Sequence, residues 1–145
     1  MNINIIYTSI TGNNEEIADI VKNELNKKKY HPLVSQIDDI EIEDLKKSDL
    51  IFVITYTWDN GTIPDEALDF YDDLDKIDWS KKKVIVIGSG DKFYGADFGK
   101  AVDTFNKKFK KIGAKMPVES FKINIEPNKK DTLKIKDTIT KLLKN

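Results

Sequence analysis

Residues 4–21, NIIYTSITGNNEEIADIV, join two structural patterns. The β-branched apolar run that ends at Tyr7 predicts a strand, and the apolar spacing from Asn14 onward predicts a helix. Hydroxyl and amide side chains and one glycine fill the junction between them. A strand that leads through a short polar loop into a helix is the repeating unit of α/β proteins. The junction therefore favours an α/β fold.

Strand-like and helix-like segments alternate along the rest of the chain. The expected strands are 2–7, 31–36, 50–56, 83–89 and one around 118–125; the expected helices are 14–28, 64–74, 97–112 and 130–143, with a short turn or helix near 43–48. The runs LIFVIT and KVIVIG are almost entirely apolar, as in strands buried on both faces of a parallel sheet. We predict a three-layer, doubly wound sheet of five parallel strands in the order 2-1-3-4-5.

Composition limits the class of protein. At 145 residues the chain has the length of one domain, and we expect residues 1–145 to form a single domain of this fold. Its apolar runs are all shorter than the ~20 residues that span a membrane, and no signal-peptide pattern opens the chain, so a cytoplasmic protein is expected. Without cysteine it can have no disulfide or thiolate metal site. No catalytic or metal-ligand spacing emerges either.

The net charge of −1 hides an uneven distribution. Residues 36–79 carry 14 acidic residues and three lysines, a local net charge of −11, so the rest of the chain carries +10. The acidic segment forms either an ordinary solvated surface or a docking face for basic partners. The lysine-rich end at 129–144 lacks clustered arginines and interleaved aromatic residues, so nucleic-acid binding is not expected.

Three loops are expected to form the ligand site, because ligands bind beyond the carboxyl ends of strands where the strand order reverses. These loops are 8–14, 56–64 and 89–97. The first offers neutral donors at a helix N-terminus, which suits a terminal phosphate. It lacks the lysine of a P-loop and the GxGxxG pattern. The alternative is that Asn13 or Asn14 only caps the helix.

The other two loops carry aromatic side chains. Trp58 follows the third expected strand, and Phe93 and Tyr94 follow the fourth. Aromatic residues on two loops at one sheet edge are able to hold a planar ring between them. Alternatively, they close the top of the core. The remaining lone residues, His31 and Trp79, are interpreted as structural or surface residues.

Together the three loops resemble those of flavodoxins. TSITGNN at 8–14 is similar to the phosphate-loop pattern T/S-x-T-G-N-T, with Asn14 where threonine is usual. TYTWDNG at 55–61 is similar to T-W-G-D-G, and GSGDKFYG with the later AVD is similar to G-S-G-D…Y…A-V-D. The match runs from residue 2 to about 103, and the uninterrupted last strand resembles the short-chain group.

The resemblance implies an FMN-binding electron carrier that is not an enzyme. Trp58 and Tyr94 would flank the flavin ring, the backbone of Asp91, Phe98 and Gly99 would face its pyrimidine edge, and the first loop would hold the phosphate. Asp59 stands where the family commonly has glycine. The cofactor-binding residues implied in this way are Thr8, Ser9, Ile10, Thr11, Gly12, Asn13, Asn14, Thr55, Tyr56, Thr57, Trp58, Asp59, Asn60, Gly61, Ser89, Gly90, Asp91, Tyr94, Phe98 and Gly99.

The implied function is low-potential, one-electron transfer between a flavin-dependent reductase and acceptor enzymes. These partners would dock at the acidic face of a monomer, without nucleic acid or membrane. A flavodoxin-like activator of manganese ribonucleotide reductase is the main alternative. A receiver domain shares the strand order but needs paired acidic residues after its first strand, where this chain has YTSITGNN. A flavin quinone reductase would need a substrate pocket that the sequence does not locate.

Overall fold

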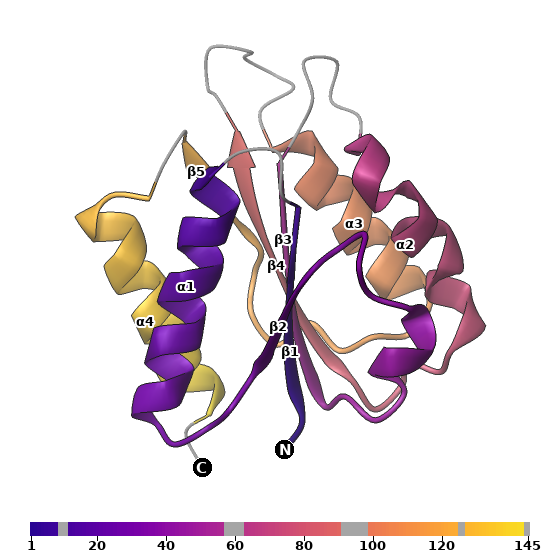
Figure 1. The fold of residues 1–145 in the computed structure, drawn as a ribbon, viewed down its shortest axis with the longest axis horizontal. Helices are drawn as coiled ribbons and strands as arrows, with labels where there is room; N and C mark the ends of the chain where they lie inside the picture. Colours follow the sequence, from indigo (N-terminus) through magenta and orange to yellow (C-terminus); the bar gives the residue numbers. More distant parts are fainter. Residues whose placement is uncertain (9–11, 57–62, 91–98, 125–126, 144–145) are drawn as a thin grey trace.

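The computed structural model describes residues 1–8, 12–56, 63–90, 99–124 and 127–143, and in them strands and helices alternate (Figure 1). With η for a 3-10 helix, the elements are β1 Ile3–Tyr7, α1 Gly12–Lys27, β2 Leu33–Gln36, η1 Ile42–Leu45, β3 Leu50–Tyr56, η2 Asp65–Ala67, α2 Leu68–Asp73, η3 Leu74–Lys76, β4 Lys83–Gly90, α3 Lys100–Lys111, β5 Phe121–Asn124 and α4 Lys129–Leu142.

The sheet confirms the predicted topology. Its five strands are parallel and lie in the order β2-β1-β3-β4-β5. β3 pairs with β4 along its whole length, from Leu50 opposite Lys83 to Tyr56 opposite Ser89. On its other side, β3 pairs with β1 up to Tyr7 opposite Ile54. The carboxyl ends of β1, β3 and β4 therefore meet at one edge of the sheet.

Helices cover both faces of the sheet, with α1 and α4 on one side and α2 and α3 on the other (Figure 1). Alternate residues of β3 enter the two cores: Phe52 packs in the α1/α4 cluster and Val53 in the α2/α3 cluster. Burial on both faces explains why the strand sequence is apolar at nearly every position.

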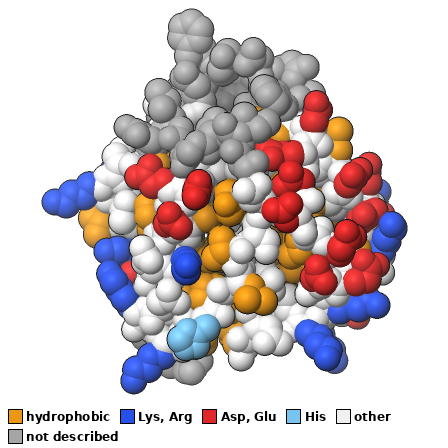
Figure 2. Space-filling model, in the orientation of Figure 1, with side chains coloured by type: hydrophobic (Ala, Val, Ile, Leu, Met, Phe, Trp, Pro, Cys, Tyr) orange, Lys and Arg blue, Asp and Glu red, His pale blue; other side chains and the backbone are white. Residues whose placement is uncertain are grey.

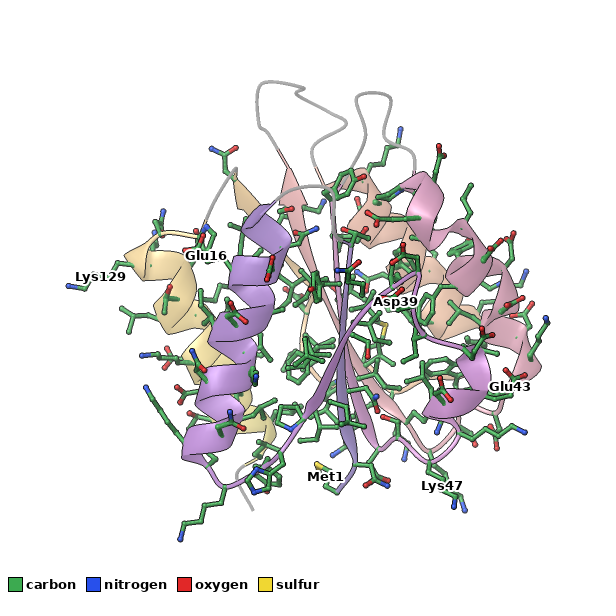
Figure 3. All side chains as sticks on the ribbon, in the orientation of Figure 1. Met1, Glu16, Asp39, Glu43, Lys47 and Lys129 are labelled. Atoms are coloured by element: carbon green, nitrogen blue, oxygen red, sulfur yellow. The ribbon has the colours of Figure 1, made fainter. Side chains whose placement is uncertain are left out.

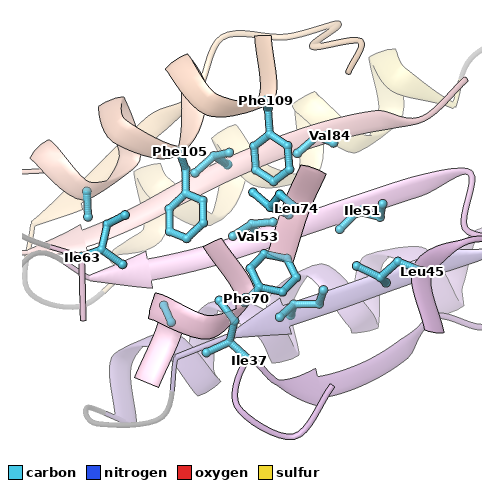
Figure 4. Close-up of a cluster of buried hydrophobic side chains, with 14 of the residues drawn as sticks. Ile37, Leu45, Ile51, Val53, Ile63, Phe70, Leu74, Val84, Phe105 and Phe109 are labelled. Carbon is cyan, nitrogen blue, oxygen red and sulfur yellow. The ribbon is translucent and has the colours of Figure 1, made fainter. Parts of the chain in front are cut away.

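Aromatic rings fill much of the α2/α3 core (Figure 4). Phe105 of α3 meets Tyr71 edge-on at a centroid distance of 5.5 Å, and Trp79 meets Phe109 in the same way at 5.2 Å. The indole Nε1 of Trp79 donates a hydrogen bond of 2.7 Å to the carbonyl oxygen of Leu74. Trp79 is thus a structural residue, as predicted.

The expected fifth strand, 118–125, was too long, since β5 begins only at Phe121. Lys115 forms an isolated bridge with Lys83 at the start of β4, after which the chain leaves the sheet. Pro117 has no N–H to donate, and the hydroxyl of Ser120 bonds the side chain of Asn106 at 2.6 Å. The sequence cannot reveal this detour, because Val118 is apolar for another reason: it packs against the α1/α4 core.

The expected helix 64–74 is divided into η2, α2 and η3. Its backbone departs from regular α-helix at Ala67, where φ is −99° and ψ is −6°. Tight 3-10 turns at helix ends are common. At the other helices, α1 starts two residues earlier than expected, at Gly12, and α3 starts later, at Lys100. Among the described residues, no helix is long and apolar enough to cross a membrane.

Candidate cofactor site

Four neutral polar side chains are buried where β1, β3 and β4 end. Thr8, Asn14 and Thr55 have no exposed surface, and Ser89 is 3% exposed. All four belong to the set implied by the sequence resemblance. Because buried polar groups normally have hydrogen-bond partners, their bonds show how this edge is built.

Asn14 joins the ends of two strands. Its amide Nδ2 donates to Thr8 Oγ1, and its Oδ1 accepts from Ser89 Oγ; both bonds are 2.6 Å long. Thr8 follows β1, and its backbone N–H donates to the carbonyl oxygen of Ile54 in β3 at 3.0 Å. The first turn of α1 is therefore tied to the ends of β1 and β4.

The position of Asn14 excludes one of the two residues, Asn13 and Asn14, that were considered as caps of the helix. Since α1 begins at Gly12, Asn14 lies inside the first turn and its side chain is buried, so Asn14 is not the residue that caps the helix. The backbone N–H groups of a first turn have no partner within the helix. They give this edge hydrogen-bond donors and a partial positive charge.

The end of β3 lies in a negative field. Thr55 Oγ1 donates to the carbonyl oxygen of Tyr56 at 3.2 Å, and Tyr56 is 6% exposed. Burial raises the pKa of the Tyr56 hydroxyl well above its ordinary value, and the carboxylates of Glu66 and Asp65 raise it further. The start of η2 thus brings negative charge close to this edge, where forming another anion is disfavoured.

Gly99 requires a backbone conformation that side chains rarely adopt. It precedes α3 with φ of 70° and ψ of 13°, and a side chain there would collide with the stem of Lys122. The ammonium of Lys122 in turn pairs with Asp103 Oδ2 at 3.1 Å. Asp103 is the last residue of the AVD motif quoted from the sequence, whereas Lys122 was not singled out, because nothing near Lys122 in the chain indicates that its side chain covers Gly99.

The structure describes only a few of the other implied site residues. Gly90 ends β4 and is half-buried, and Gly12 and Asn13 form the start of α1. The rest lie outside the described residues: Ser9, Ile10, Thr11, Thr57, Trp58, Asp59, Asn60, Gly61, Asp91, Tyr94 and Phe98.

The family model for flavodoxin matches residues 5–137. The chain belongs to the flavodoxin family. It is 34% identical over 129 residues to probable flavodoxin 2 of Bacillus subtilis, with 85% of this chain and 82% of that one covered. Flavodoxins are electron carriers rather than enzymes, and FMN is the cofactor of the family.

Solved flavodoxin structures share the whole fold. A short-chain flavodoxin associated with a non-canonical PDU bacterial microcompartment superposes with a TM-score of 0.93 and 41% identity, covering 99% of this chain and 98% of that one. A Fusobacterium nucleatum flavodoxin, solved bound to flavin mononucleotide, has the same fold at a TM-score of 0.82 and 19% identity, covering 97% and 96%.

The buried donor set suits the phosphate of a flavodoxin cofactor. Thr8, Asn14, Thr55 and Ser89 are all neutral. The Ser89 and Thr55 hydroxyls already donate within the protein, so the donors left at this edge are the Thr8 hydroxyl and the backbone N–H groups in the first turn of the 16-residue helix α1. Neutral hydroxyl and amide donors together with a helix N-terminus bind a phosphate monoester without a lysine or arginine. The residues present therefore fit FMN at its phosphate end.

Acidic side chains gather on one side of this flavodoxin, over η1 and α2 (Figure 2). We call them the acidic surface; its exposed members are Asp38, Asp39, Glu41, Glu43, Asp44, Asp65, Asp69 and Asp72. Asp38, Glu41, Asp69 and Asp73 are among the residues that line a groove of about 180 Å³. Glu43 lies on this side of the sheet, whereas Lys129 lies at the start of α4 on the opposite side (Figure 3).

Proposed function

We propose that this flavodoxin binds FMN non-covalently and carries single electrons between a flavin-dependent reductase and acceptor enzymes in the cytoplasm, with residues 1–145 acting as one domain. The arrangement that carries the proposal is the buried Thr8, Asn14 and Ser89 set beside the N-terminus of α1. When bound, FMN supplies the ability to accept and release one electron at a time. The protein supplies binding, orientation and an electrostatic environment.

At the phosphate end, the chain holds the cofactor with neutral donors. The Thr8 hydroxyl and the free N–H groups of the first turn of α1 donate to phosphate oxygens, together with the Thr11 and Asn13 groups implied by the resemblance. At the ring end, Trp58 and Tyr94 stack on the two flavin faces. Backbone groups at Asp91, Phe98 and Gly99 receive the pyrimidine edge.

The negative field at the end of β3 makes the carrier a low-potential one. Glu66 and Asp65 already disfavour an anion at Tyr56, and they act in the same way on a cofactor that gains negative charge at this edge. For a one-electron step, about 59 mV corresponds to a tenfold change in equilibrium. A small added repulsion therefore lowers the potential measurably.

The acidic surface is the proposed docking face for partners. Its carboxylates on η1 and α2 are exposed and of one sign, which attracts proteins that surround their own redox centre with lysine and arginine. Such association slows as salt screens the charges. The carrier works as a monomer that meets its partners transiently at this face.

Binding of FMN and riboflavin to the apoprotein tests the proposal, since the two flavins differ only by the phosphate. We expect FMN to bind at least about tenfold more tightly, because charge-assisted bonds to the phosphate add to ring stacking. Thr8→Val removes the donor but keeps the shape, so it should weaken FMN more than riboflavin. Thr138→Val, on α4 away from this edge, is the matched control.

Equal affinities for FMN and riboflavin would contradict the assignment of this edge as the phosphate-binding site. If neither flavin binds, the proposed function itself is contradicted. Stepwise anaerobic reduction of the FMN-loaded protein then measures both one-electron potentials. A potential for the second one-electron reduction that is no lower than that of free FMN would contradict the low-potential assignment.

A further inference from the structure

Three side chains form one directed hydrogen-bond chain beneath the cofactor edge. The hydroxyl of Ser89 donates to Asn14 Oδ1, and Asn14 Nδ2 donates to Thr8 Oγ1. This series of hydrogen bonds links Asn14 to Ser89, 75 positions further along the sequence, and each of the three side chains is at least 97% buried. It therefore connects the carboxyl end of β4, which includes Ser89, with Thr8 directly after β1.

The direction of the chain determines which hydrogen is left over. A serine or threonine hydroxyl has one hydrogen to donate and two lone pairs that accept. Ser89 donates its hydroxyl hydrogen to Asn14 Oδ1, while Thr8 Oγ1 accepts a hydrogen bond from Asn14 Nδ2. The hydrogen of Thr8 is then available to donate beyond the chain. Successive hydrogen bonds also polarise one another, which makes the terminal hydroxyl a better donor.

We propose that Asn14 is a positioning residue that couples the end of β4 to phosphate binding by orienting the Thr8 hydroxyl toward the phosphate. This inference rests on the proposed function and deepens it. The threonine that flavodoxins usually have at this position carries a single polar atom. Asparagine separates its acceptor from its donor, so it spans the gap between Ser89 and Thr8 with one atom for each bond.

A double-mutant cycle with Ser89→Ala and Asn14→Ala tests the coupling. FMN and riboflavin affinities are measured for each variant, and the FMN/riboflavin ratio is the readout because a loss of fold or of ring contacts affects both flavins. Ser89→Ala should reduce the ratio about three- to tenfold, the effect expected for one buried hydrogen bond. In the Asn14→Ala background, Ser89→Ala should leave the ratio unchanged.

Ser120→Ala is the matched control. It removes a serine-to-asparagine bond of the same 2.6 Å length, between Ser120 and Asn106, on another part of the molecule. The FMN/riboflavin ratio should not change in this variant. The melting temperature of every variant separates lost stability from lost coupling.

Two outcomes of the cycle overturn the inference. Equal losses of FMN and riboflavin in Ser89→Ala would make Ser89 a ring contact or a purely structural residue. A Ser89→Ala effect that persists at full size without Asn14 would mean that Ser89 acts on the phosphate by another route.

A second measurement needs no flavin and no Ser89 variant. Inorganic phosphate added to the wild-type apoprotein should shift the NMR amide signals of Ser89 and Gly90 as well as those of residues 8–14, and Asn14→Ala should abolish the shifts at 89 and 90. Shifts confined to residues 8–14 in the wild type would overturn the coupling. If instead phosphate couples the two segments while FMN does not bind, the proposed function fails and the coupling stands.

Discussion

Val102 of α3 fills the space that a side chain on Gly88 of β4 would need. Gly88→Ala should therefore destabilise the protein by about 1–3 kcal/mol, the usual cost of overpacking a core. Since Gly88 precedes Ser89, the change should also disturb the cofactor edge. Urea unfolding followed by circular dichroism measures the loss.

The double variant Gly88→Ala, Val102→Ala tests whether the collision is the cause. Removing the γ carbons of Val102 frees the space, so the double variant should be more stable than the sum of the two single losses predicts. Strict additivity of the two single losses would show that Gly88 is required for some other reason.

Lys82 is a buried lysine at the opposite edge of the sheet, 5% exposed, whose ammonium donates to the carbonyl oxygens of Lys46 at 2.6 Å and Ser48 at 2.9 Å. Lys82→Met keeps the stem but leaves both oxygens without this donor. We expect a loss of about 1–3 kcal/mol at pH 7 by denaturant unfolding. The neighbouring exposed Lys81→Met should change stability little.

The same residue gives a pH dependence with a definite sign. Burial lowers the pKa of Lys82 below its ordinary 10.5, an effect that Asp49 and Asp78 partly oppose. Between the lowered value and 10.5, the unfolded chain holds more protons than the folded one, so raising the pH favours folding through this group. The stability of the wild type relative to Lys82→Met should rise across this window. A fall would show that the ammonium is stabilised where it lies.

Lys108 of α3 reaches across to the segment around α2. Its ammonium lies 3.2 Å from Asp75 Oδ1 and 5.1 Å from the centroid of the Tyr71 ring, and its side chain is 17% exposed. Lys108→Ala should cost about 1 kcal/mol, from the partly buried ion pair, the cation–π contact and the packed stem. Thermal unfolding of this variant and of the exposed Lys107→Ala should differ; equal effects would assign the loss to helix propensity.

Glu66→Gln tests the electrostatic contribution to the redox potential. Removing one of the carboxylates that act on Tyr56 should raise the potential of the second one-electron reduction of the FMN-loaded protein by tens of mV. Asp137→Asn on α4, on the other side of the sheet, should leave the potential almost unchanged. A shift of equal size in both variants would assign the effect to total charge and not to local placement.

Much of the fold was predictable because residues buried in the core are apolar, and their spacing is visible in the sequence. The β3 prediction was correct at both ends, since each residue from Leu50 to Ile54 packs into one core or the other. The shorter β5 was not predictable, because Ser120 leaves the sheet to bond Asn106, a partner distant in sequence.

The cofactor site was predictable in location but not in connectivity. Hydroxyl and amide residues at the ends of apolar strands marked Thr8, Asn14 and Ser89 as candidates. Which of these side chains bond one another depends on the register of β3 against β1 and β4, which no local pattern encodes. The position of Lys122 over Gly99 was hidden for the same reason, since it depends on where β5 enters the sheet.

Negative charge gathers over η1 and α2, while the rest of the chain carries a positive net charge. This separation of charge gives the molecule an electric dipole, although its net charge is only −1. A uniform field exerts almost no net pull on such a molecule but does exert a torque. Near a basic partner, within about 10 Å at 0.1 M salt, the protein would be rotated before it is drawn in. Orientation would then be selected during approach and need not be found by repeated collisions.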